Sequence, residues 1–156
     1  QEISVIYSDY HLFDQLLGVD NADLARQVQH YLEVLHLDSK VVYESGRFST
    51  LALSDGQRRR MALLAAIIDD KALYLFDEWA ADQDPMFKAV FYNEILPALR
   101  ARGKAVVAIT HDDRYFGLAD QLIVLEEGQV ARIERRQVEQ PPAHDPQLKR
   151  EFLMPA

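Results

Sequence analysis

An acidic pair that directly follows an apolar run is the first feature of the sequence that could do chemistry. The stretch "ALYLF" (72–76) is typical of a buried strand, and it ends on Asp77 and Glu78. At a strand end, Asp77 could hold Mg²⁺ through water, and Glu78 could act as a general base towards an attacking water. The pair could equally be the start of a loop, and the pair alone does not decide between these interpretations.

A second candidate is the segment "LSDGQ" (53–57). Ser54 and Gln57 have the spacing of a capping box, which favours an ordinary helix start. A helix N-terminus beside Gly56 is also a place where phosphate can bind. The arginine run 58–60 adds positive charge, but a solvated helix face is the simpler use of it.

A third candidate is His111, which follows the apolar run "AVVAIT" (105–110). A single histidine after a strand is most often a loop or capping residue. As a functional group, it would reach a γ-phosphate and sense whether that phosphate is present.

The elements that must position these residues alternate between strands and helices. The helix that begins at Pro85 has Asp84 as its expected cap, and Pro97 should bend it. Several strands are apolar on both faces, which predicts an α/β fold with a mainly parallel sheet covered by helices. Ligands of such sheets bind beyond the carboxyl ends of the strands. The predicted strands are 2–7, 72–76 and 105–110, the predicted helices 21–37, 54–68 and 85–102, and a predicted hairpin covers 120–134 with its turn at 127–128.

Composition excludes several classes of protein. The 156 residues, 49% of them hydrophobic, suffice for one domain with a core, and without cysteine there are no disulfides or thiolate metal sites. The net charge of −8 argues against nucleic-acid binding. No apolar run approaches the roughly 20 residues of a membrane helix. The N-terminus has neither an initiator Met nor the pattern of a signal peptide, so we expect the chain to begin inside a larger protein.

The order and spacing of these motifs are more specific than any one of them. Ser54 lies 23 residues before Asp77, and His111 lies 27 residues after Asp84. Over roughly residues 3–135 this arrangement resembles the ATPase domain of ATP-binding cassette (ABC) proteins. More narrowly, "DEWAADQDP", "FYNEILPALRARGK" and "ITHDDRYF" resemble the bacterial exporters of cyclic peptides and siderophores, of the pyoverdine and syringomycin type.

The resemblance implies a P-loop NTPase-like fold with the ABC helical subdomain, and ATP with Mg²⁺ as ligands. It implies as partners a second ATPase domain, paired head to tail around two ATP molecules, and a transmembrane domain, at the cytoplasmic face of the bacterial inner membrane. By the same resemblance, the signature loop that contacts the opposite subunit's ATP contains Ser54, Gly56 and Gln57, the Walker B aspartate is Asp77, the catalytic glutamate Glu78, the D-loop aspartate Asp84 and the switch histidine His111.

The sequence departs from the family pattern at three points. Asp55 replaces the usual third residue of the signature, glycine, and a carboxylate there suits the helix dipole but not a triphosphate. The glutamine of the Q-loop would fall near Ser8, where Ser8 or Asp9 could take its place as a metal ligand. The sequence has no G-x-x-x-x-G-K-[ST], whose backbone N–H groups and lysine form most of the triphosphate cradle.

We therefore expect a partial ABC ATPase domain over 1–135 that lacks the Walker A part and is inactive alone. Residues 8–70 would include the helical subdomain and the signature helix, 71–135 the core from Walker B to the switch histidine, and 136–156 a tail. Two alternatives stay open: a soluble ABC-type ATPase of DNA repair or translation, and a non-catalytic dimerisation module. The acidic charge argues against the first, and the intact Glu78 and His111 argue against the second.

Overall fold

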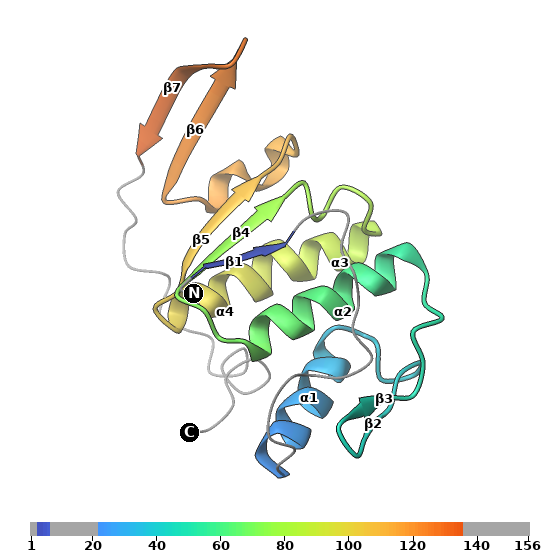
Figure 1. Ribbon diagram of the computed structural model, residues 1–156. Helices are drawn as coiled ribbons and strands as arrows, with labels where there is room; N and C mark the ends of the chain where they lie inside the picture. The colour runs from blue at the N-terminus through green and yellow to red at the C-terminus, as the bar shows by residue number, and fades with distance from the viewer. Residues whose placement is uncertain (1–2, 7–21, 136–156) are drawn as a thin grey trace.

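A parallel three-stranded sheet with helices on one face organises the chain (Figure 1). The computed structural model describes residues 3–6 and 22–135. The strands in these ranges are β1 (Ile3–Ile6), β2 (Tyr43–Glu44), β3 (Arg47–Phe48), β4 (Leu73–Asp77), β5 (Ala105–Ile109), β6 (Gln121–Glu126) and β7 (Gln129–Arg135). The helices are α1 (Ala22–Val34), α2 (Asp55–Ile68), α3 (Pro85–Val90), the π-helical turn η1 (Phe91–Ile95), α4 (Leu96–Ala101) and the 3₁₀ helix η2 (Asp113–Leu118).

The sheet has the order β1-β4-β5, and both pairings are parallel. Leu75 of the central strand stands opposite Val5 on one side and Val107 on the other. The mainly parallel α/β sheet predicted from the apolar runs is therefore confirmed. The helices, however, cover only one face of the described sheet, and the other face exposes apolar side chains such as Val107 and Ile109.

The covered face carries the core. Tyr74 and Phe76 of β4 point towards the helices and are fully buried. Phe76, Phe91 and Trp79 form an aromatic cluster, with ring centroids 5.1 Å apart for Phe76 and Phe91 and 4.5 Å apart for Trp79 and Phe91. Aromatic rings at these separations add to the free energy gained by burying their surface. The residue after the acidic pair is thus fixed in the core.

Both predicted helix starts have the expected caps. The Ser54 hydroxyl accepts from the Gln57 N–H, and the Gln57 side chain accepts from the Ser54 N–H, which completes a capping box at the start of α2. The Asp84 carboxylate accepts from the Phe87 N–H at 2.9 Å, with Pro85 in the first turn of α3.

The predicted helix 85–102 is interrupted near its middle. It consists of α3, the π-helical turn η1 and α4, and the Leu96 N–H donates to the Phe91 carbonyl five residues earlier. Pro97 has no N–H and its ring crowds the preceding turn, so a wider turn just before it relieves a conflict inside the helix.

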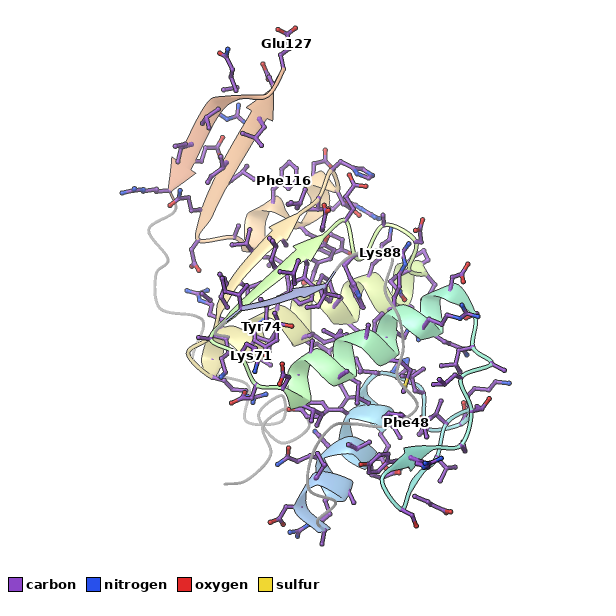
Figure 2. All side chains as sticks on the ribbon, in the orientation of Figure 1. Phe48, Lys71, Tyr74, Lys88, Phe116 and Glu127 are labelled. Atoms are coloured by element: carbon purple, nitrogen blue, oxygen red, sulfur yellow. The ribbon has the colours of Figure 1, made fainter. Side chains whose placement is uncertain are left out.

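The remaining elements lie at the two ends of the molecule. α1 packs beside α2, and the short β2–β3 pair packs against α1, while the β6–β7 hairpin projects away from the three-stranded sheet (Figure 1). Its turn, with Glu127 at the tip (Figure 2), has positive φ at both Glu127 and Gly128 and confirms the predicted hairpin. Within the described ranges, every helix is too short or too polar to cross a bilayer. Ser8, Asp9 and the tail 136–156 lie outside the described residues.

Candidate active site

The acidic pair lies at the carboxyl end of the central strand. Asp77 is the last residue of β4, paired with Ile109 of β5. The next backbone N–H, that of Glu78, donates to the Ile109 carbonyl at 3.1 Å. Glu78 itself has φ 45°, in the left-handed region, which costs a non-glycine residue about 1 kcal/mol or more. The buried Trp79 that follows and this hydrogen bond hold the chain in that conformation.

The predicted base and switch histidine meet at this point. Nδ1 of His111 lies 3.6 Å from Oε1 of Glu78, and both side chains are more than half exposed. The two residues are 33 positions apart in sequence and are joined because β4 and β5 are parallel neighbours. The structure therefore brings Asp77, Glu78 and His111 to one sheet edge, as the carboxyl ends of parallel strands require.

A hydroxyl network that the sequence did not reveal supports the histidine. The Tyr92 hydroxyl donates to Oγ1 of Thr110 at 3.0 Å, and the Asp112 N–H donates to the same oxygen at 3.1 Å. The Tyr92 ring stacks on that of Tyr115 with centroids 4.0 Å apart. Burial raises the pKa of Tyr92, so its hydroxyl stays protonated and able to donate. These contacts fix the backbone on both sides of His111.

A pocket of about 300 Å³ opens over Glu78 and His111. Lys88 lines it from α3, on the side facing the end of β4 (Figure 2), and Arg114 lines it from η2. Arg114 makes a bidentate pair with Asp112, at 2.8 and 2.6 Å, and this pair lowers the pKa of Asp112. Of the two cations that line the pocket, Arg114 is therefore already paired, whereas Lys88 forms no ion pair with the described residues.

The described residues contain no cluster of three or more acidic or histidine side chains that could hold a metal by themselves. Asp77 offers one carboxylate, half-buried at the strand end. Magnesium commonly binds one or two protein carboxylates together with substrate phosphates and water, so this donor set fits Mg²⁺ that arrives with a nucleotide.

The signature segment is a separate part of the candidate site. Ser54 and Gln57 are engaged with each other in the capping box, and Asp55 is exposed. Among the described residues, no hydrogen bond or ion pair joins this segment directly to Glu78 or His111. A phosphate-binding role for Ser54, Gly56 and Gln57 stays a prediction.

The arginine run corrects the sequence interpretation. We expected 58–60 to form a solvated face, but the side chains of Arg59 and Arg60 are only 12% exposed. Arg60 pairs with Asp84 at 2.5 Å, and Arg59 pairs with Asp82. Only Arg58 is exposed. No local signal identified these contacts, because each spans more than 20 residues of sequence.

The sequence is similar to a known protein family and to several ATP-binding proteins. The family described as "ABC transporter" matches residues 1–81. The chain is 51% identical over 128 residues, 80% of its length, to the ATP-binding protein SyrD of Pseudomonas syringae pv. syringae. It is 27% identical over 85% of its length to the sn-glycerol-3-phosphate import ATP-binding protein UgpC of Vibrio vulnificus (strain YJ016).

A third relative is the aliphatic sulfonates import ATP-binding protein SsuB 1 of Paracoccus denitrificans (strain Pd 1222), 29% identical over 92% of the chain. The chain spans 23% of the length of SyrD, 38% of that of UgpC and 62% of that of SsuB 1. The relatives thus include both SyrD and named importers, and identity is far higher to SyrD.

Proposed function

Because this chain belongs to the ABC transporter family, we propose that it forms the part of an ATP-hydrolysing domain that extends from the signature to the switch histidine. The observation that supports this most directly is the 3.6 Å approach of His111 to Glu78 at the end of β4. A carboxylate and an imidazole at a strand edge, beside a second carboxylate at Asp77, suit hydrolysis of the terminal phosphoanhydride bond of ATP by water.

The proposed roles follow from position. Glu78 accepts the proton of the attacking water, because its carboxylate is exposed in the pocket. His111 donates to the γ-phosphate, with its backbone held by the Thr110 network. Asp77 would hold Mg²⁺ that arrives with the nucleotide, and the metal would supply positive charge against the phosphates. The signature residues serve the ATP of an opposing subunit.

We propose further that the parent protein is a bacterial exporter of peptides or siderophores. Support comes from the resemblance of the 77–85 and 109–116 segments to that subgroup, and from the 51% identity to SyrD against 27–29% to the named importers. Such a parent works with a second ATPase domain and a transmembrane domain at the cytoplasmic face of the inner membrane. The chain alone, without a phosphate-binding loop, does not hydrolyse ATP.

The test uses the full-length parent with the substitution Glu78→Gln. We expect ATP binding to persist and turnover to fall by about 100-fold or more, because the amide cannot accept the proton. Glu126→Gln, on the β6–β7 hairpin, is the matched control and should turn over ATP at the wild-type rate. Turnover within a few-fold of wild type in Glu78→Gln would rule out Glu78 as the base.

A further inference from the structure

Two arginines of α2 bind the loop that follows Glu78, which we call the D-loop segment (79–84). Arg59 uses both ends of its guanidinium: Nη1 donates to the Trp79 carbonyl at 3.3 Å, and Nη2 pairs with the Asp82 carboxylate. The helix therefore contacts the D-loop segment at its first residue and again near its end.

Arg60 makes a second set of contacts. Its Nε donates to Oε1 of Gln83 at 3.0 Å, and its Nη2 pairs with Asp84 at 2.5 Å. The guanidinium also lies 3.7 Å from the centroid of the Phe87 ring, a cation–π contact. Burial lowers the pKa of Arg60, and Asp84 opposes that effect. A guanidinium taken this far out of water is stabilised only when such partners are in place.

Gln83 connects the D-loop segment back to the signature. Its side chain is 5% exposed and is the one buried polar or charged side chain among the described residues. Its amide oxygen accepts from Arg60, and its amide nitrogen donates to the Gly56 carbonyl at 3.2 Å. The Gln83 side chain is therefore hydrogen-bonded to α2 at two places, Gly56 in its first turn and Arg60 one turn later.

We propose that Arg59, Arg60 and Gln83 are positioning residues that make the signature and the D-loop segment one rigid unit. Trp79 follows Glu78 directly, so a displacement of the signature also displaces the backbone of the proposed base. The functional consequence of this inference rests on the proposed function. If the signature serves the opposite subunit's ATP, the unit links one ATP site to the base of the other.

The contacts of Arg59 and Arg60 with the D-loop segment, and of Gln83 with α2, are called the tether below. The first measurement tests whether the tether holds the D-loop segment in place, independently of any activity. Within the D-loop segment, the Ala81 N–H donates to the Glu78 carbonyl at 3.0 Å and the Gln83 N–H donates to the Ala80 carbonyl at 3.1 Å. In the full-length parent, hydrogen exchange of residues 79–84 should be about tenfold faster in Arg59→Gln and in Arg60→Lys than in wild type. Arg60→Lys keeps the charge but loses the planar fork, and is the milder variant should the other fold poorly.

Arg100→Gln is the control, because Arg100 on a different helix also pairs with an aspartate, Asp120 at 2.7 Å, but its side chain is 44% exposed and does not contact the D-loop segment. It should leave exchange of 79–84 unchanged. Unchanged exchange in both Arg59→Gln and Arg60→Lys would overturn the tether, whatever the protein hydrolyses.

The second measurement asks whether the tether positions the base. Arg59→Asp and Asp82→Arg should each lower kcat for ATP by about fivefold with KM within twofold of wild type, and the double variant should recover most of the loss. A residue with a purely structural role would change stability without this recovery of kcat. Faster exchange with unchanged kcat would overturn the positioning role. A wild-type parent without ATPase activity would instead refute the proposed function, and the exchange measurement would still decide the tether.

Discussion

The two faces of the three-stranded sheet differ sharply although they belong to the same strands. On the covered face, Tyr74 and Phe76 are 0% and 1% exposed. On the open face, Ile3, Val107 and Ile109 are 50%, 49% and 51% exposed. Both faces are apolar, which is the pattern of parallel strands buried on both sides. The described helices therefore cover only one of the two apolar faces of the sheet.

The open face of the sheet also carries Asp77, one of the proposed site residues. Side chains alternate along a strand, so Asp77 shares the open face with Leu73 and Leu75. Under the proposed function, the part of the parent that holds the phosphates covers this face and meets Asp77 there. The covered face holds the site in place, because Trp79, which directly follows Glu78, is buried in the core on that side. The comparison suggests that stability comes from one side of the sheet and ligand binding from the other.

The largest effect should come from opening the covered face. Phe76→Ala should lower the free energy of unfolding by about 3–5 kcal/mol, because Phe76 is buried against Trp79 and Phe91. The same truncation at Ile109 should cost less than about 1 kcal/mol in this chain. Denaturant unfolding followed by Trp79 fluorescence measures both, and equal losses would mean that the two faces do not differ energetically.

The second effect concerns ligand binding. Titration of this chain with Mg-ATP should give no heat up to millimolar nucleotide, while the parent should bind in the micromolar range, a difference of about 1,000-fold. Of the two cations that line the pocket, Arg114 is already paired with Asp112, which leaves Lys88 to attract a phosphate, too little for tight binding. Micromolar binding by this chain would show that a phosphate cradle exists within residues 1–156.

The third effect separates folding from chemistry at Gly56. A Cβ at this position would lie 3.6 Å from Oε1 of Gln83, an ordinary contact, so Gly56→Ala should leave stability unchanged or raise it by up to about 1 kcal/mol. Under the proposed function, turnover of the parent should nevertheless fall by about tenfold or more, because the methyl group lies against the Gln83 side chain that joins the signature to the D-loop segment. Gly103→Ala is the converse control: φ of +75° makes it destabilising, with no effect on turnover.

A fourth, smaller effect tests the open face directly. We expect the exposed apolar patch to make copies of this chain associate. Val107→Lys should weaken that association, because it places a charge in the patch, and should change the stability by less than about 1 kcal/mol. Light scattering against concentration measures the association. Met86→Lys, at a position 71% exposed on α3, is the control and should not alter it.

The smallest effect is a pH dependence at Asp84. The N–H of Phe87, and then Arg60, lower the pKa of this carboxyl. A lowered pKa means that the stabilisation is fully present above the ordinary value of about 3.9 and is lost as pH falls through the folded-state value. Asparagine keeps the helix cap but loses the ion pair with Arg60. Because the Asp84 side chain is 53% exposed and Gln83 and Phe87 still contact Arg60, Asp84→Asn should cost only about 1 kcal/mol at pH 7, and the difference should vanish in acid. Thermal unfolding across pH, with the exposed Asp38→Asn as control, measures it.

Sequence reasoning succeeded where the determining contacts are local or follow from the sheet type. The caps at Ser54 and Asp84 and the turn at Gly128 depend on residues within a few positions. The meeting of Glu78 with His111 followed from two parallel strands that end together.

Contacts between distant side chains were not predictable in this way. Nothing near Thr110 indicates Tyr92, and nothing near Arg59 indicates Asp82. A run of three arginines has the same local pattern whether it faces water or a loop 20 residues away. Only the packing of α2 against the D-loop segment decides which arginine is buried.

The π-helical turn η1 determines how α4 is rotated about the helix axis relative to α3. One extra residue per turn rotates everything after it by about 100° relative to a regular helix. Phe91 and Tyr92 begin this turn and are both buried: Phe91 packs against Trp79, and Tyr92 reaches Thr110. Removing one residue from the later part of the turn would leave these two contacts on α3 and rotate α4 by about 100° relative to them. The irregular turn therefore determines which face of α4 packs on the core while α3 supports the histidine loop.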